Sequence, residues 1–576
     1  MQLTRIRIHN FRSVIDADIH AHDFTILVGA NNAGKSNCIN ALRCFYGELQ
    51  WNEDDFPKNG FKDEDSWTEL SFDLTNDEWN ALDNKYKEGA KEQKIVLKRY
   101  FKGDKVKARQ SNIYAIVNEV EQDGIFYSTK NIKPAKCGRI VYIPALTSPN
   151  EQMKTTGPSP LRDMLSFILG RVLPQSTGYT QLNQAFEHLN REANSENGFL
   201  SQIAQPINNA LNQWGVELDL SVNHISPEII TKSLISYSFT DKILGNAGFG
   251  LERFGHGFQR AVIYELFRLA SSIQQETQNK TNEFDPNYTL LLFEEPEAFL
   301  HPSQQENLAY YLRQFGKESG QQVIVTSHSP VFVSKNSDEL EQICRIQKDN
   351  GVSQIYQLKE ADEETLICSG GDFLNVLKQY IEDPTVTQSN KKKAKDLVKN
   401  APTEEIAHQY EEFRFQLWLD ADRASMFFAD KVLLVEGATE KALFNYLLAN
   451  DWHDLTKERI LVVDALGKYN FHRFINLFAR FGIRHGIIMD NDNNDNHHEV
   501  INQLIRDRTN EFTLADPVEF EGCLEKYLGL SLPTSNNQKP LKILYAVKNK
   551  MISSEKLVQL RDAFCKALAI QTPGDK

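Results

Sequence analysis

The chain has 576 residues, more than a single hydrophobic core supports, so two or three domains are expected. Hydrophobic residues make up 41%, and no apolar run is long enough to span a bilayer or to form a signal peptide, which predicts a cytoplasmic globular protein without a membrane partner. The net charge of −14 argues against a constitutive, tight binder of the nucleic-acid backbone, and the seven cysteines lack the paired spacing of a zinc site.

The N-terminal segment contains a phosphate-binding loop. Residues 1–28 have strand periodicity and end at Gly29-Ala30-Asn31-Asn32-Ala33-Gly34-Lys35-Ser36, which a helix over 35–45 should follow. In such a strand–GxxxxGK[ST]–helix arrangement, backbone N–H groups surround the phosphates, Lys35 contacts the β/γ oxygens and Ser36 ligates Mg²⁺. We therefore expect the chain to bind and hydrolyse ATP, with Asn31, Asn32 and Gly34 in the phosphate cradle.

The rest of the chain divides by pattern into further segments. Strand-like runs occupy 69–74, 94–101 and 139–144. We predict that 1–149 is the first part of an α/β ATPase, 150–235 a helical insertion with a role in dimerisation, 236–346 the second ATPase part, 347–424 a polar connector and 425–576 a doubly wound α/β unit. Helices are expected over 161–173, 182–192, 203–213, 439–449 and 470–481, and the last unit should contain strands 432–435, 460–463 and 486–489.

Two strand ends carry side chains suited to ATP hydrolysis. The apolar run 290–293 ends in Glu294 and Glu295, of which the first can hold Mg²⁺ and the second can orient the attacking water. A later strand ends in His328, which can contact the γ-phosphate. Each of these features alone is more often a surface or structural feature, but their order after a phosphate loop favours the catalytic interpretation.

A fourth motif precedes the helix expected over 261–271. Gly255 and Gly257 permit close approach of the backbone to an anion, although a plain turn explains them better as an isolated motif. In this order the four motifs resemble the ABC/SMC group of ATPases, which includes RecF. The resemblance implies γ-phosphate contacts from Gly257 and Gln259 in a signature loop, where His256 replaces the usual Ser. It also implies that two ATPase faces sandwich the nucleotide in a homodimer or a higher homo-oligomer.

The C-terminal unit contains a second group of acidic residues. One strand ends in Glu436, and Glu440 lies one helical turn later, while Asp490 and Asp492 follow another strand. In a parallel doubly wound sheet these carboxylates emerge at one edge and provide the oxygen ligands that paired Mg²⁺ or Mn²⁺ ions need for phosphodiester cleavage. The alternative for the run after Asp490 is a solvated polar loop, since it lacks the Gly and Glu spacing of an EF-hand.

This second half resembles a Toprim domain, and Ala465-Leu466-Gly467-Lys468 is similar to the variant in OLD-family (overcoming lysogenisation defect) nucleases. The resemblance implies an α/β fold in which an ABC/SMC-type P-loop ATPase with a helical insertion precedes a doubly wound Toprim domain. It also implies a further acidic ligand, Glu519 or Glu521, and a Lys that stabilises charge on the phosphate. We choose Glu521 and Lys539, with Lys542, Lys548 and Lys550 as competitors.

The family resemblance implies an ATP-regulated, metal-dependent DNA endonuclease of bacterial anti-phage defence. Its metal ligands would be Glu436, Glu440, Asp490 and Asp492, and its partner a Gabija-like helicase or a retron reverse transcriptase with its DNA product. The competing hypothesis is a RecF-like, ATP-driven DNA-binding repair protein whose Toprim unit does not cleave, which the intact acidic motifs disfavour. The residues leave open the DNA target, the direction of the ATP effect and the number of subunits.

Overall fold

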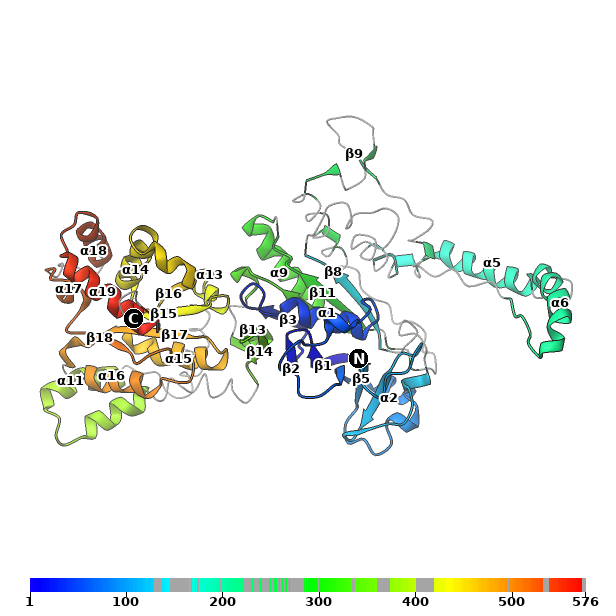
Figure 1. The fold of residues 1–576 in the computed structure, drawn as a ribbon, viewed down its shortest axis with the longest axis horizontal. Coiled ribbons are helices and arrows are strands. Elements are labelled where there is room, and N and C mark those ends of the chain that lie inside the picture. The colour runs from blue at the N-terminus through cyan, green and yellow to red at the C-terminus, as the bar shows by residue number, and fades with distance from the viewer. Residues whose placement is uncertain are drawn as a thin grey trace. The chain divides into compact units, whose positions relative to one another are not determined.

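The computed structural model describes most of the chain and divides it into two compact units (Figure 1). Unit 1 comprises residues 1–2, 75–83 and 136–323, and unit 2 comprises 3–74, 84–135 and 324–576. No helix in the described part of the chain combines the length and the apolar character that a membrane crossing requires. The structure describes residues 1–571 apart from 129–136, 146–164, 221–228, 231–237, 241–247, 271–283, 334–336, 360–372, 400–418, 495–496, 532–537 and scattered short gaps between 166 and 299.

The N-terminal strands of unit 2 are antiparallel. In β2, Asp16 and Asp18 are exposed while Ala17 and Ile19 are buried, the alternation expected of a strand with one face on a core. β4 and β5 confirm the strands predicted from the sequence at 69–74 and 94–101. β1 (Gln2–Phe11) pairs with β2 (Val14–His20), and β4 (Ser66–Asp73), β5 (Lys94–Lys102), β6 (Ile113–Val117) and β7 (Val120–Glu121) pair in that order.

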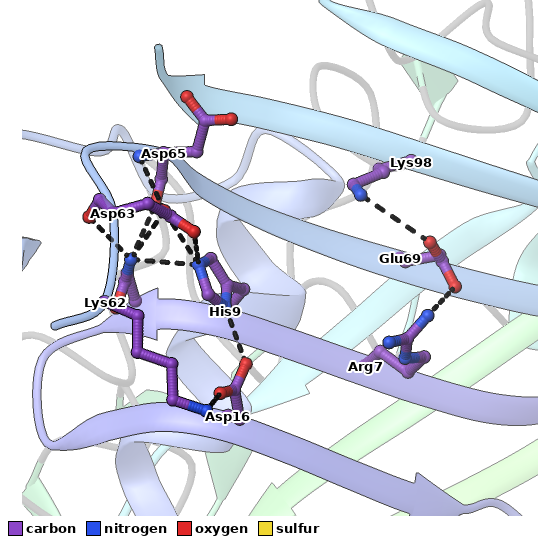
Figure 2. A network of polar contacts seen from close by, with 9 residues as sticks. Arg7, His9, Asp16, Lys62, Asp63, Asp65, Glu69 and Lys98 are labelled. Atoms are coloured by element: carbon purple, nitrogen blue, oxygen red, sulfur yellow. Dashed lines mark hydrogen bonds and ion pairs between the residues drawn. The ribbon is translucent and has the colours of Figure 1, made fainter. Parts of the chain in front are cut away.

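A polar network joins β1 to its surroundings. Figure 2 shows His9 between two carboxylates, with 2.6 Å from its Nδ1 to Asp16 and 3.0 Å from its Nε2 to Asp63. Further along the same strand, Arg7 donates to Glu69 of β4 at 3.2 Å. Both ring nitrogens of the buried His9 have partners, so the network satisfies the hydrogen-bonding groups of this imidazole.

The strand that leads into the phosphate loop is central. β3 (Phe24–Val28) is buried over its whole length, as is typical of a strand covered on both faces. It pairs in parallel with β13 (Ile343–Asp349), which pairs antiparallel with β14 (Val352–Gln357). α1 (Lys35–Phe45) follows the loop and confirms the predicted helix. The loop therefore lies at the carboxyl end of a buried parallel strand, the usual position for a ligand-binding loop in α/β sheets.

Unit 1 contains the strand that ends in the paired ATPase acids. β8 (Arg139–Ile143) pairs in parallel with the fully buried β11 (Thr289–Glu294). Two described helices confirm the predicted ones at 182–192 and 203–213, whereas the predicted helix 161–173 lies largely outside the described residues. The other elements are α2 (Asn76–Ala81), α5 (Thr177–Ala193), α6 (Phe199–Leu211), β9 (Phe239–Thr240), β10 (Gly248–Phe249), α9 (Pro302–Gly316) and β12 (Gln321–Thr326), which leads into unit 2.

The C-terminal part of unit 2 (420–571) is a parallel sheet with helices around it (Figure 1). It is called the nuclease part below, after the activity that the sequence resemblance implies. Its strand order is β16 (Ile460–Asp464), β15 (Lys431–Val435), β17 (His485–Asp490) and β18 (Val518–Phe520), and each neighbouring pair is parallel. Leu433, Phe444, Ile488 and Phe564 belong to its core. The predicted doubly wound unit is confirmed. Its helices are α13 (Ala421–Ala424), α14 (Ala438–Asn450), α15 (Phe471–Arg480), α16 (His498–Asp507), α17 (Leu524–Tyr527), α18 (Lys539–Lys548) and α19 (Ser554–Ala567), and α11 (Gln388–Lys399) precedes them.

Candidate active sites

Two glycines give the phosphate loop its shape. Gly29 has φ 141° and Gly34 has φ 116°, conformations that residues with a side chain rarely adopt. A Cβ at Gly29 would lie 2.1 Å from Ile346 O, and a Cβ at Gly34 would lie 2.2 Å from Ser353 Oγ. Backbone angle and close packing therefore both require glycine at these two positions.

The loop lysine is already in place. Lys35 is buried, and its ammonium group donates to Gly29 O at 2.9 Å and to Ala30 O at 3.0 Å. These carbonyl oxygens hold the cation over the loop, where it can exchange them for phosphate oxygens. The predicted ligand-binding residues Asn31, Asn32 and Ser36 are exposed beside it.

Two serines outside the sequence motif brace the loop. Ser353 of β14 donates to Ala33 O at 2.6 Å, and its Oγ lies 2.7 Å from the Oγ of Ser13. Asn37 of α1 donates to the same Ser13 hydroxyl at 2.7 Å. Sequence reasoning missed Ser353 because it lies 320 residues from Ala33 and no local pattern marks it.

His328 lies near the loop strand within unit 2. The backbone N–H of the preceding Ser327 donates to Leu27 O of β3 at 3.2 Å, and the His328 ring lies 6.5 Å from the ring of Phe428. The residue thus follows a strand segment bound to β3, as its proposed contact with a γ-phosphate requires. The predicted signature-loop residues Gly257 and Gln259 lie outside the described residues.

The paired ATPase acids belong to unit 1. Glu294 is the last residue of β11 and is buried, and Tyr142 of β8 donates to its Oε2 at 3.3 Å. Glu295 follows with φ 46°, a left-handed conformation uncommon for a residue with a side chain. The left-handed backbone at Glu295 thus ends the extended strand directly after Glu294.

In the nuclease part, the carboxyl ends of two neighbouring strands bring the predicted acids to one edge. β15 ends immediately before Glu436, and β17 ends with Asp490. Glu440 lies in the first turn of α14, where its Oε2 accepts a hydrogen bond from the backbone N–H of Gly437 at 3.0 Å. Asp492 follows β17 with φ 50°. Since β15 and β17 are parallel neighbours, these four acids share one edge of the sheet.

Burial and mutual repulsion perturb these carboxyl groups. Burial first, and then the negative charges of Glu440 and Glu436, raise the pKa of Asp490 to about 8. Burial likewise raises the pKa of Glu440 to about 7 and that of Glu436 above its usual range. Buried acids that repel one another favour a cation between them, so the charge pattern is that of a divalent-metal site.

The unsatisfied oxygens at this edge fit a metal ion. Glu436 Oε2 and Glu525 Oε1 are buried, and neither accepts a hydrogen bond from the described residues, although the Lys539 ammonium lies 3.6 Å from Glu525 Oε1. In the described part of the chain no three side chains of metal-binding type already form a cage, and the buried Lys468 ammonium instead donates to Asp490 O and Asp492 Oδ2. Lys468 thus supplies positive charge among the carboxylates. Sequence analysis noted its motif but gave this side chain no role.

The acidic residues downstream of Asp492 differ in their surroundings. Glu521 is exposed, and Glu519 forms an ion pair with Arg506. Glu525 of α17 is buried, and its carboxylate lies 3.6 Å from the ammonium group of Lys539. Its negative charge also raises the pKa of Glu440, after burial and the charge of Glu436. We therefore place Glu525, in preference to Glu521, with the predicted lysine at this site.

Comparison with known families agrees with both sites. Residues 1–142 and 166–333, more than half of the chain, match the model of the AAA ATPase domain. Residues 427–492 match the model described as overcoming lysogenization defect protein-like, TOPRIM domain, and include the four acids described above. The chain belongs to the family of the AAA ATPase domain, and its C-terminal part carries an OLD-like Toprim domain. It combines an AAA ATPase with a Toprim nuclease domain, as the order of its motifs predicted.

OLD-family relatives align with most of the chain. It is 24% identical to Old nuclease of Escherichia phage P2, over 85% of this chain and 77% of the relative. It is 21% identical to endonuclease GajA of Bacillus cereus (strain VD045), over 91% and 83%, and 22% identical to OLD nuclease of Thermus scotoductus, over 85% and 82%. Among solved structures, an SmcHead bound to the C-winged helix domain of ScpA aligns with 63% of the chain and 100% of its own, at 15% identity and a TM-score of 0.35.

The raised pKa values predict how the stability of this protein depends on pH. Unfolding returns both carboxyl groups to a pKa of about 4, so the folded state binds more protons and loses stability as pH rises through about 7 for Glu440 and about 8 for Asp490. In EDTA we expect a lower melting temperature at pH 9 than at pH 7, and Asp490→Asn should reduce this difference. Differential scanning fluorimetry measures it. Identical pH dependence in wild type and variant would contradict the perturbed Asp490.

Proposed function

We propose that this protein is an ATP-controlled, divalent-metal-dependent DNA endonuclease that cleaves at the carboxylate cluster of its Toprim domain. The observation that supports this most directly is the buried Glu436 oxygen that accepts no hydrogen bond among the described residues, together with the buried carboxyl groups of Glu440 and Asp490, whose pKa values are raised. Such a group of oxygens suits Mg²⁺ or Mn²⁺ better than it suits a vacant protein interior.

The proposed division of roles follows the geometry of the nuclease part. Glu436, Glu440, Asp490 and Asp492 would hold the metal with Glu525, and bound ions would supply Lewis acidity for phosphodiester hydrolysis. Lys539 lies within 3.6 Å of Glu525, where its charge can stabilise the negative charge that builds on the phosphate. A non-cleaving RecF-like role gains no support from this cluster, because a DNA-binding scaffold has no need of buried acids.

The ATPase would act as the control element. In the proposed roles Asn31, Asn32, Gly34 and Lys35 hold the phosphates, Ser36 and Glu294 hold Mg²⁺, Glu295 orients water and His328 contacts the γ-phosphate. Gly257 and Gln259 would contact the nucleotide of a second subunit, which makes a homodimer or a higher homo-oligomer part of the proposal. We further propose the domain boundaries given above and a role in cytoplasmic anti-phage defence with a helicase or a retron reverse transcriptase and its DNA product as partner.

Nicking of a supercoiled plasmid tests the proposed function. Wild-type protein should convert the plasmid to open-circular or linear form with Mg²⁺ or Mn²⁺, and EDTA should abolish the conversion. Adding ATP or a slowly hydrolysed analogue should change the rate. Binding of DNA without any metal-dependent cleavage, over a range of both metals and nucleotides, would favour the RecF-like role instead.

A further inference from the structure

One buried arginine joins the ATPase strands to the nuclease part. Arg345, in β13, is 2% exposed, and its guanidinium donates to backbone carbonyl oxygens of four residues that lie 82 to 137 positions further along the chain. The acceptors are Phe427 O at 3.1 Å, Ala429 O at 3.1 Å, Phe481 O at 3.0 Å and Gly482 O at 2.8 Å, with Gln347 Oε1 at 2.8 Å in addition. The guanidinium therefore holds a defined main-chain geometry in two separate segments.

Neighbouring cations are bound differently. A cavity of about 290 Å³ between residues 30–33 of the phosphate loop and the nuclease part is lined by Arg345 and several other basic residues. Three of these form ion pairs with carboxylates: Lys431 with Glu458 at 2.9 Å, Arg484 with Asp349 at 3.0 Å and Arg459 with Asp430 at 3.6 Å. Within the described residues, Arg345 donates to no carboxylate. The guanidinium of Arg345 donates to uncharged oxygens. Its hydrogen bonds therefore fix the direction and position of the backbone and do not neutralise a negative charge.

The four carbonyl groups precede the two strands that bear the nuclease acids. Phe427 and Ala429 come just before β15, which leads directly to Glu436. Phe481 and Gly482 come just before β17, which ends in Asp490. These strands are short and their residues are almost entirely buried, so a shift at their beginnings is transmitted to their ends. One guanidinium thus sets the relative position of both acids from the opposite ends of their strands.

On its other side, Arg345 is next to the phosphate loop. It pairs in the parallel ladder with Val28, the last residue of β3 before the loop. Gly29 approaches the backbone of Ile346 so closely that a Cβ would meet its carbonyl oxygen at 2.1 Å. The rings of His328 and Phe428, 6.5 Å apart, form a second contact between the ATPase strands and the nuclease part. Movement of the loop therefore has to move β13 or strain the packing against it.

We propose that Arg345 is a positioning residue that couples the phosphate loop to the metal-binding carboxylates of the nuclease part. Occupation of the loop shifts β13, and Arg345 passes the shift to the starts of β15 and β17, which changes the separation of Glu436 and Asp490. This inference rests on the proposed function and adds the residue through which nucleotide controls cleavage.

The test uses Arg345→Lys and Arg345→Gln in the full chain, with Arg484→Gln as the matched control. The control removes an exposed ion pair that joins the same two parts of unit 2. Plasmid nicking in Mn²⁺ is measured with and without a slowly hydrolysed ATP analogue, together with the KM and kcat for ATP. The quantity compared is the ratio of the nicking rates with and without nucleotide. We expect nucleotide to change wild-type nicking by about fivefold or more. Arg345→Lys should bring the ratio close to one with the KM for ATP within about twofold, whereas Arg484→Gln should keep the wild-type ratio.

A second measurement does not depend on the variants or on cleavage. Hydrogen exchange of the wild-type protein should change at 427–435 and 481–490 when the analogue binds, with helix α19 as the internal reference. Absence of that change, or a wild-type nucleotide ratio in Arg345→Lys, overturns the coupling. If wild type fails to nick in any metal, the proposed nuclease function fails by itself, and the exchange measurement still decides whether the loop and these strands are coupled.

Discussion

Replacing Glu436 with Gln or Asp490 with Asn is expected to lower metal-dependent plasmid nicking by at least about 100-fold, because loss of a direct metal ligand exceeds the roughly 10- to 100-fold effect of removing an outer-shell partner. Both substitutions preserve side-chain size and remove the negative charge that a divalent ion needs. ATP hydrolysis should remain within about twofold of wild type, since neither residue touches the phosphate loop. Initial rates of nicking and of phosphate release, measured on the same preparation, check both expectations.

The neighbouring acids provide a sharper comparison. Glu525→Gln removes a buried carboxylate near Lys539, whereas Glu521→Gln changes an exposed one. We expect the first to reduce nicking strongly and the second to leave it near wild type. The opposite result would return the role of metal ligand to Glu521. Undiminished nicking by both Glu436→Gln and Asp490→Asn would place the nuclease centre elsewhere in the chain.

Replacing Glu295 with Gln is expected to slow ATP hydrolysis by about 100-fold or more while nucleotide binding persists, because a positioned general base contributes roughly that much to a proton transfer. Glu295 follows β11 directly and retains its size in the variant, so the fold of unit 1 should be unaffected. Steady-state phosphate release measures turnover, and fluorescence of a labelled ATP analogue measures binding.

A lysine variant separates binding from turnover. Lys35→Ala removes the cation that the loop holds and should weaken nucleotide binding itself, in contrast to Glu295→Gln. If Glu295→Gln hydrolyses ATP at the wild-type rate, the role of base passes to another residue, and Glu294 is the first to examine. Equal loss of binding in the two variants would mean that Glu295 supports the loop rather than the reaction.

The elements that bear the chemistry could be predicted because local patterns encode them. A strand, a glycine loop with Lys35 and a helix occur within a single short stretch, and the strands ending before Glu436 and at Asp490 have continuous apolar runs. Parallel pairing then places the acids together, since carboxyl ends meet at one edge. These parts of the fold and of the two sites follow from local sequence patterns together with the general geometry of parallel sheets.

Other contributions depend on pairing between distant segments. Ser353 reaches the loop only because β14 pairs with β13, which pairs with β3. The exposure of Glu521 and the burial of Glu525 have a similar origin, because the backbone N–H of Gly522, at φ 74°, donates to the Asn491 side chain and turns the chain just before α17. No motif marks such contacts, and they arise from tertiary packing.

Four acceptors of the Arg345 guanidinium are main-chain oxygens, and this determines which residues can change between related proteins without loss of the proposed coupling. Every residue has a backbone carbonyl oxygen, so substitutions at Phe427, Ala429 and Phe481 can leave the hydrogen bonds of Arg345 intact. Gly482 is restricted, because it has φ 60° and a Cβ would lie 2.6 Å from the ring of Tyr356. A relative with an identity of 21% can therefore keep these hydrogen bonds by keeping the path of the backbone. Because these contacts do not depend on the side chains of the acceptors, covariation between residue pairs would not detect them. In a chimera with the Toprim domain of a relative, the coupling should depend on whether the backbone before the two strands follows the same path.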